Sequence, residues 1–460
     1  MKLIIYMMVT YLFIDLVAST LMLPWLPTII KELCEKDAGL KAVWEFVHTK
    51  ILRAKGGVEL SAKDATFIGS CAASLMSLTQ YICSSTFGAM SDTMGRKSVL
   101  LMLCIMHIFS HLLLASSGVS IVFFLLARIL LGATRANVGI LSAMISDVSD
   151  RESRTGAMAS LGIAYSLAFT VGPKASSWIL NKLFFSKESS GSVLGPHIGL
   201  FAAFLVCIDL LMLFTFPETA TLKKDTEKKM APKRSLWQSL KILNPIELFR
   251  FHGIEDYQTR AKMQKMAQVL FLHMSLYSGL ECSLLFLAQQ RFGYTGEKQS
   301  HIFLFTGVSM VIVQHGIMKY LKGGREIKTV LTAMLLQVMA YLTLGFSISE
   351  WMFYTGLLFY SVTSSLFSPT FNSLASLSIG SQQQGQVMGI FRSINGLARC
   401  VGPSLVGTLM WRVGTTTTFT LGAGATILVA VVFKSIPNLE VFPTNAQAKA
   451  STVSPEKKSS

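Results

Sequence analysis

The sequence predicts an all-α protein that crosses a membrane twelve times, with its helices in two bundles of six. Charged residues make up only 14% of the chain, against about 25% in soluble domains, and the mean hydropathy is +0.52. Twelve apolar segments are long enough to cross the hydrocarbon layer as helices, which takes about 20 residues each. A polar, lysine-rich segment separates the first six from the last six.

The predicted spans follow the apolar segments along the chain. They cover residues 4–30, 65–89, 98–117, 120–147, 155–181, 197–217, 265–288, 300–320, 328–348, 351–376, 385–411 and 414–436. The first is too long for the apolar core of a cleavable signal peptide and has no A-x-A site, so we interpret it as a retained helix. An even number of spans places both termini on one side of the membrane.

Basic residues in the turns indicate which side is cytosolic. Lys and Arg are concentrated in the turns after spans 2, 4, 6 and 8, and the turns after spans 3 and 9 carry none. Cytosolic loops carry the excess of positive charge, so these four turns and both termini are predicted to be cytosolic. We therefore assign the net charge of +16 to topology and to contact with anionic lipid headgroups, and not to nucleic acid. The pattern fits a plasma membrane or an endomembrane equally.

Four regions follow from this pattern. They are an N-terminal six-helix half (1–217), a cytosolic linker with a surface helix near 237–251 (218–264), a C-terminal six-helix half (265–436) and a disordered cytosolic tail (437–460). An internal repeat supports two related halves, because Gly172-Pro173 recurs 230 residues later as Gly402-Pro403.

A short charged turn between spans 2 and 3 reads GAMSDTMGRKSVLL. Its charges cannot lie in hydrocarbon, so the turn is predicted at the membrane surface. Glycine allows a tight turn and close helix approach, while aspartate can pair with arginine and offer its carboxylate to a facing helix N-terminus. We predict a conformational latch made of Gly88, Asp92, Gly95, Arg96 and Lys97. An ordinary basic loop would explain the two cations but not the glycine and aspartate spacing.

This turn resembles the signature between helices 2 and 3 of the major facilitator superfamily. Span 1 (DLVASTLMLPWLP), span 4 (RILLGATRANVG) and span 5 (AFTVGPKASS, with Gly172 and Pro173) resemble motifs of its drug:proton antiporter branch, which includes tetracycline-efflux proteins. The phrases SGLECSLLFLAQQRF and VMGIFRSINGLARCVGP are similar to an animal member of that branch. The resemblance implies the major facilitator fold and a transporter, with drug efflux and antiport among its expected activities.

Some residues depart from these motifs. Gln80, eight residues before the latch, matches tetracycline-efflux proteins, but Ser85 stands where they usually have proline. Lys174 and Ser176 replace the apolar residue and the glycine usual in the span-5 motif. The resemblance therefore implies the class of protein more firmly than its cargo.

Charged side chains inside the predicted spans mark a pathway, because each costs at least about 2.5 kcal/mol to insert. The candidate substrate and proton pathway consists of Asp15, Gln80, Arg128, Arg135, Glu281, Asn395, Arg392 and Arg399. The arginines in each of spans 4 and 11 are seven residues apart, so each pair is expected on one helix face. The amides serve equally well as hydrogen-bonding groups between helices.

The sign of these charges predicts the cargo. Five cations (Arg128, Arg135, Lys174, Arg392, Arg399) outnumber three carboxylates (Asp15, Asp209, Glu281). Arginine stays charged whatever its burial, so we expect an anionic cargo, such as an amphipathic carboxylate or a drug-like anion, bound bidentately. A cationic drug fits this excess less well.

Protons are the expected coupling ion. Burial favours the neutral form of a carboxyl and a nearby arginine favours its charged form, so opening and closing of a cavity can load and release a proton. The candidates are Asp15, paired with Arg128, and Glu281, alone in span 7. The alternatives are a static ion pair between spans 1 and 4 and, for Glu281, a hydrogen-bonded packing residue. We expect Asp209 to be structural.

No cofactor and no metal site is expected. The chain has no GxxxxGK[ST] sequence, which argues against ATP hydrolysis as the energy source. His107 and His111 share a helix face, but they have no third ligand nearby and are better explained as a polar stripe than as a metal or proton site. The ending Lys457-Lys458-Ser459-Ser460 resembles an endoplasmic-reticulum retrieval signal, or is a solvated tail.

Together these features predict a monomeric secondary transporter of small organic anions that works by alternating access and is coupled to protons. It is not expected to be an enzyme, because no nucleophile and base set is visible. The alternatives are a non-transporting receptor or scaffold on a transporter fold and an uncoupled facilitator. Neither the particular anion nor the choice between import and export follows from the sequence.

Overall fold

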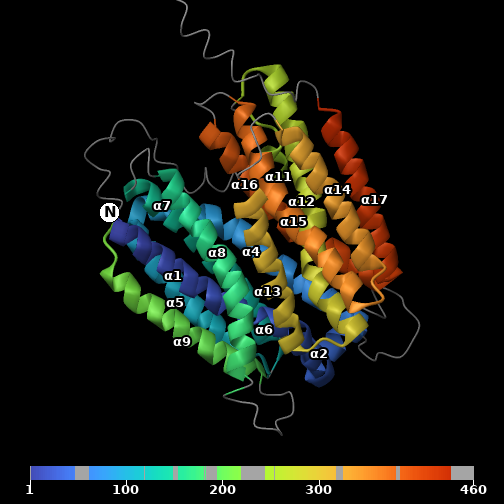
Figure 1. Cartoon of the computed structure of the whole chain (residues 1–460). Helices are drawn as coiled ribbons and strands as arrows, with labels where there is room; N and C mark the ends of the chain where they lie inside the picture. The colour runs from blue at the N-terminus through green and yellow to red at the C-terminus, as the bar shows by residue number, and fades with distance from the viewer. Residues whose placement is uncertain are drawn as a thin grey trace, which may run out of the picture.

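The structure, a computed structural model, describes residues 2–46, 62–118, 120–148, 154–180, 182, 194–218, 244–252, 254–317, 325–379 and 384–436. Every regular element in these residues is a helix, which confirms the predicted all-α class. Figure 1 shows helices of the N-terminal half on one side and of the C-terminal half on the other, with α4, α8 and α13 between them.

In the N-terminal half, two of the predicted spans are each divided into shorter helices. They are α1 (Lys2–Thr20), η1 (Leu23–Trp25), α2 (Leu26–Lys36), α3 (Ala38–Phe46), α4 (Ala62–Met94), α5 (Arg96–Ala115), η3 (Ser116–Gly118), α6 (Ile121–Thr134), α7 (Asn137–Val148), α8 (Arg154–Ile179) and α9 (Leu194–Thr215). The predicted first span is divided because Pro24 and Pro27, which lack an N–H, each occupy the first turn of a new helix. The fourth is divided after Thr134, so Arg135 lies in a turn.

The C-terminal half has longer uninterrupted helices. They are α11 (Pro245–Leu248), α12 (Tyr257–Phe292), α13 (Gly296–Ile312), the π-helical η6 (Val313–Ile317), α14 (Glu326–Gly345), α15 (Glu350–Leu377), α16 (Gln384–Val413) and α17 (Thr415–Lys434). Most of the predicted linker, including the larger part of its surface helix, lies outside the described residues, as does the tail from 437 on.

Seven helical segments in the described part of the chain are long and apolar enough to cross a membrane. They are Leu3–Lys36, Arg96–Gly118, Ile121–Val148, Pro196–Thr215, Tyr257–Phe292, Glu326–Gly345 and Thr415–Lys434. The other long helices, α4, α8, α13, α15 and α16, coincide with the remaining predicted spans but carry more polar residues. The count of twelve membrane crossings and the four region boundaries stay predictions.

Each bundle has its own apolar core, and each core contains one aromatic side chain that belongs to the other bundle. Phe286 of α12 is 1% exposed and packs in the core formed by α1 to α9, where a Cβ added to Gly69 would overlap its ring. Tyr81 of α4 packs in the core formed by α11 to α17, with Gly396 of α16 beside it. The two bundles therefore interlock along α4, where Phe286 packs at Gly69 and Tyr81 packs at Gly396.

Hydrogen bonds join the halves at one end. They run from Gln290 Nε2 to Thr66 Oγ1 (2.6 Å), from Trp411 Nε1 to Asp64 Oδ1 (2.6 Å) and from the Ser404 N–H to Ser74 Oγ (2.9 Å). These groups belong to the first half of α4 and to the last parts of α12 and α16, opposite the turn at Gly95. The molecule is thus closed at the end that the charge pattern places outside the cytosol.

Candidate functional site

Asp15, which is 1% exposed on α1, lies within a buried polar cluster. Its Oδ1 is 2.8 Å from His107 Nδ1 on α5, and its Oδ2 is 3.6 Å from Arg135 Nη1. Ser19, one turn further along α1, donates its hydroxyl to the Asp15 carbonyl oxygen (2.9 Å) and lies 3.1 Å from His107 Nε2. The predicted pairing of Asp15 with Arg128 is wrong, because the chain turns after Thr134 and brings Arg135 to Asp15 instead.

Arg128 is a buried cation without a local acid. It is 6% exposed on α6, and no carboxylate of the described residues lies within ion-pair distance of it. Its guanidinium lies over the Phe124 ring at 5.3 Å, its Nη1 is 3.7 Å from Met76 Sδ, and its Nε has no hydrogen-bond partner. Aromatic and sulfur contacts stabilise a guanidinium only partly, so this position favours an anion.

A second charged group lies in the C-terminal half. Arg399 Nη2 on α16 is 2.8 Å from Glu281 Oε2 on α12, and their side chains are 43% and 32% exposed. Tyr277 and Tyr360 stack beside this pair with ring centroids 5.1 Å apart. Tyr165 of α8 is close enough to both Arg399 and Arg135 to interact with them electrostatically. Glu281 is therefore not alone, contrary to the prediction.

Other predicted pathway residues contribute less. Arg392 is exposed, so its inclusion among the buried cations is wrong; it precedes the part of α16 that packs on α4. Lys174 donates to His301 Nε2 of α13 at 2.7 Å, at the closed end. Gln80 and Asn395 are half-buried, and Asn395 Oδ1 has no hydrogen-bond partner. Asp209 is fully buried on α9, but neither of its carboxyl oxygens is hydrogen-bonded.

The latch residues form a network within the N-terminal half. Arg96 Nη1 is 2.6 Å from Asp92 Oδ1, and its Nε is 3.3 Å from Asp147 Oδ2 of α7. Gly95 has φ +99°, which only glycine adopts easily, so the predicted tight turn is confirmed. A Cβ on Gly88 would meet nothing within 4 Å, so the close approach predicted there is absent from this conformation. The Asp92 side chain is 63% exposed.

Glu218 contacts the latch, and the sequence analysis did not assign it a role. Its carboxylate accepts the backbone N–H groups of Arg96 and Lys97, both at 3.0 Å, at the N-terminus of α5. Lys97 Nζ in turn donates to the carbonyl oxygens of Phe214, in the last turn of α9, and Phe216, just after it (2.9 and 2.8 Å). A carboxylate at a helix N-terminus and an ammonium at a C-terminus both satisfy orphan backbone groups. The sequence Pro217-Glu218-Thr219 was the available signal.

The Gly172-Pro173 motif lies within α8, where it permits close packing. A Cβ on Gly172 would overlap the Thr20 hydroxyl of α1, and a Cβ on Gly307 of α13 would overlap Thr170. Helix α8 therefore lies tightly between α1 of its own half and α13 of the other. Gly172 therefore packs within the N-terminal half, whereas Thr170, two residues earlier, lies at the contact with the other half.

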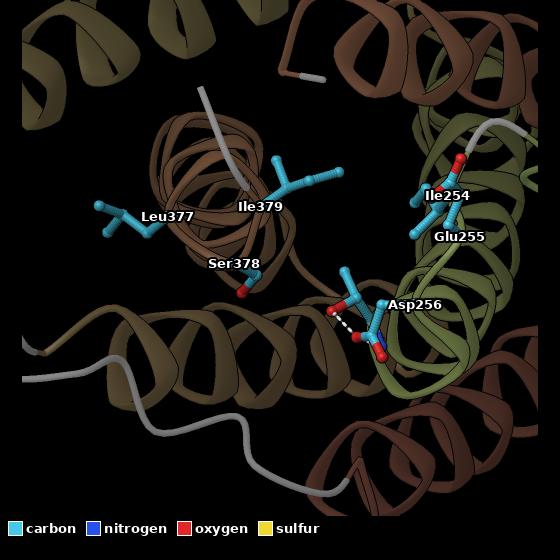
Figure 2. Close-up of a pocket in the computed structure, with 7 residues that line it drawn as sticks. Ile254, Glu255, Asp256, Leu377, Ser378 and Ile379 are labelled. Carbon is cyan, nitrogen blue, oxygen red and sulfur yellow. Dashed lines mark hydrogen bonds between the residues drawn. The ribbon is translucent and has the colours of Figure 1, made fainter. Parts of the chain in front are cut away.

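A surface cavity of about 480 Å³ lies away from these charged groups, between the start of α12 and the end of α15. Figure 2 shows Asp256 on one wall and Leu377, Ser378 and Ile379 on the other. Asp256 caps α12, and hydrogen bonds from the Thr259 hydroxyl and N–H hold its pKa below the usual range. Helix capping accounts for the role of Asp256, and none of the predicted pathway residues lines this cavity.

Comparison with known proteins decides the family. The model of the Major Facilitator Superfamily matches residues 7–403. The chain belongs to the major facilitator superfamily. The match extends over both halves, so the all-α major facilitator fold predicted from the motifs is confirmed, and the protein is a multi-pass membrane transporter and not an enzyme.

Relatives within the superfamily include human major facilitator superfamily domain-containing protein 10, 30% identical over 431 residues (91% of this chain, 89% of the relative). The Escherichia coli class C tetracycline resistance protein is 21% identical over 395 residues (85% and 86%). The crystal structure of the human organic anion transporter MFSD10 (TETRAN) has TM-score 0.72, 28% identity and coverage of 94% of this chain and 98% of that one. The resemblance indicated by the two C-terminal phrases and the tetracycline-efflux motifs is thereby confirmed.

Proposed function

We propose that this protein transports small organic anions by alternating access and couples their movement to protons. The observation that carries the proposal is Arg128, a buried guanidinium for which the described part of the chain provides no carboxylate within ion-pair distance. Arg135 and Arg399 each face an acid, whereas no carboxylate of the described residues, the buried Asp209 included, lies within ion-pair distance of Arg128. A bound carboxylate would supply the missing counter-charge.

The Arg399–Glu281 pair supports the same cargo. Both side chains remain partly accessible, so a carboxylate can reach Arg399 in competition with Glu281. Tyr165 and the stacked Tyr277 and Tyr360 give the surroundings aromatic surface. Such a setting fits amphipathic anions with an apolar or aromatic body. The name of the human relative, an organic anion transporter, agrees with this reading.

The contacts between the halves support alternating access. All the hydrogen bonds between the halves given above lie at the closed end, and the latch at the opposite end is held within one half. We infer that the structure is open to the cytosol, with both termini cytosolic, and that the exposed Asp92 engages the C-terminal half when the molecule opens outward.

The test is uptake into proteoliposomes of a panel of organic anions, beginning with radiolabelled p-aminohippurate, with and without a pH gradient. For one proton per anion at zero membrane potential, each pH unit changes the anion accumulation ratio by about tenfold. We expect saturable, gradient-dependent flux that Arg128→Gln lowers at least tenfold. The control Arg325→Gln, at an exposed arginine outside the predicted pathway, should leave the flux intact. Flux without gradient dependence would indicate a facilitator. No flux and no ligand-dependent thermal stabilisation with any anion would indicate a receptor or scaffold.

A further inference from the structure

The buried cluster around His107 has a hydrogen-bond pattern that fixes a proton count. The Ser19 hydroxyl has one hydrogen, and it is used in the bond to the Asp15 carbonyl oxygen, which cannot donate. In the contact between Ser19 Oγ and His107 Nε2, the hydroxyl oxygen must therefore accept and Nε2 must carry the hydrogen. The other ring nitrogen, Nδ1, faces the Asp15 carboxylate at 2.8 Å.

One further proton must lie between Nδ1 and Oδ1, because two bare acceptors would repel at that distance. The pair is then either an imidazolium with a carboxylate or a neutral imidazole with a carboxylic acid. Both descriptions contain one proton more than a neutral histidine beside an ionised aspartate. This conformation of the protein is thus the proton-loaded form of the pair.

The surroundings contain a cation poised to replace that proton. Arg135 Nη1 is 3.6 Å from Asp15 Oδ2, close enough for an ion pair but too far for a hydrogen bond, and neither atom has another hydrogen-bond partner. Other titratable or charged groups near the pair are His111, whose ring is tilted against that of His107 at 4.6 Å, and Tyr11, Cys104, Tyr165 and Asp209; Arg128 lies near His111. Among the described residues, only His107 and Arg135 are in ion-pair contact with Asp15.

We propose that Asp15 and His107 together hold the proton that is coupled to transport. On release, the proton on Nε2 leaves for the open aqueous side, Nδ1–H remains bonded to Asp15 Oδ1, and the Ser19 hydroxyl rotates to donate to the bare Nε2. Arg135 closes on Oδ2 and compensates the aspartate. His107 is then a proton-binding residue of the coupling machinery, and this inference rests on the proposed function for its biological role.

The protonation state is measurable without any substrate. In ¹⁵N-histidine NMR of the full-length protein in lipid nanodiscs, the His107 signal is the one missing from His107→Gln among the eight histidines of the chain. In spectra recorded over a range of pH we expect an imidazolium or an Nε2–H tautomer in the proton-loaded form and an Nδ1–H tautomer in the deprotonated form. His111→Gln, which changes the neighbouring ring, is the matched control and should retain the His107 signal. An Nδ1–H tautomer at every pH overturns the proposal.

Transport supplies a second readout. In proteoliposomes, His107→Gln keeps a hydrogen-bond donor for Asp15 but has no titratable group. Exchange of labelled for unlabelled p-aminohippurate should therefore persist, while the tenfold response to a pH unit is lost. His111→Gln should retain that response. An undiminished response in His107→Gln refutes the coupling role. If wild-type protein moves no p-aminohippurate or other anion of the panel, the proposed function fails, while the NMR result still decides the protonation of the pair.

Discussion

At the scale of single residues, the three arginines of the candidate site differ in the groups that they contact. Arg128 packs on an aromatic ring and a thioether, Arg135 shares Asp15 with His107, and Arg399 faces Glu281. A buried cation with a movable or missing counter-charge is suited to binding an anion, whereas a saturated ion pair mainly holds helices together. We therefore expect Arg128 and Arg135 to contribute more to transport than to the stability of the fold.

Glu281 provides a test of competition at Arg399. Glu281→Gln removes the carboxylate that occupies the guanidinium, so we expect tighter binding of p-aminohippurate, by several-fold, in saturation measurements. Because the pair is partly exposed, we expect a stability loss between the roughly 1 kcal/mol typical of exposed pairs and the roughly 3 kcal/mol of buried ones. Weaker anion binding in a folded Glu281→Gln protein would mean that the carboxylate contributes to the site directly.

Sequence reasoning found most of the charged residues but not their partners. The seven-residue spacing placed Arg128 and Arg135 on one face, which holds only for a continuous helix, and the turn after Thr134 breaks it. Helix α16 is continuous, yet Arg392 is exposed and Arg399 is paired, because packing on α4 begins between them. The sequence analysis explained His107 as part of a polar stripe. Its pairing with Asp15 could not be predicted, because the two residues are 92 positions apart and neither helix sequence gives the register of α1 against α5.

At the scale of helices, close packing depends on small residues. Gly172→Ala would push a methyl group into Thr20 of α1, and overpacking of this kind typically costs about 1–3 kcal/mol. We expect a lower melting temperature for the detergent-solubilised protein. Gly162→Ala on the same helix α8 meets nothing within 4 Å and should be neutral or slightly stabilising. Equal effects of the two substitutions would contradict the close contact between α1 and α8.

Asp37 ties three helices together and gives stability a pH dependence. It follows α2, accepts the Leu40 N–H of α3 at 3.0 Å and accepts the Ile121 N–H of α6 at 2.5 Å. Burial raises the pKa of Asp37, but these hydrogen bonds outweigh burial and hold it below the usual value. The stabilisation is therefore present above the ordinary aspartate pKa and is lost as pH falls through the lowered one.

Asp37→Ala should accordingly lower the melting temperature at pH 7, by an amount corresponding to about 1 kcal/mol for a lost helix cap. Melting curves recorded at decreasing pH should show the difference from wild type shrinking below about pH 4. Glu35→Ala, which alters an exposed pair with Lys31, serves as the control. A difference that is constant with pH would show that the carboxylate charge is not responsible.

At the scale of the whole molecule, the closed end is held by a clasp formed by Trp44, Asp64, Phe67 and Trp411. The rings of Trp44 of α3, Phe67 of α4 and Trp411 of α16 lie 5.6 to 6.3 Å apart, and Trp411 donates to Asp64. A hydrogen bond to a charged acceptor contributes about 1.5–3 kcal/mol, enough to change the ratio of two conformations about tenfold or more.

Trp411→Phe keeps the ring of the clasp and removes this hydrogen bond, so we expect a larger outward-open population. Hydrogen exchange measured by mass spectrometry should become faster in α3 and at the end of α16 and stay unchanged in α5. Trp351→Phe, at an exposed tryptophan of the same half, is the control. Exchange that is unaltered at the closed end would argue against the clasp as a determinant of opening.

The exchanged aromatic side chains give the two conformations different thermal behaviour. When the closed end opens, Phe286 and Tyr81 must each leave the core of the opposite bundle. Their apolar surface is then exposed to water or contacts the cargo. Hydration of apolar surface carries a positive heat capacity. The balance between inward and outward forms should therefore be a curved function of temperature, and transport rates should depart from a straight Arrhenius line even while every helix stays folded.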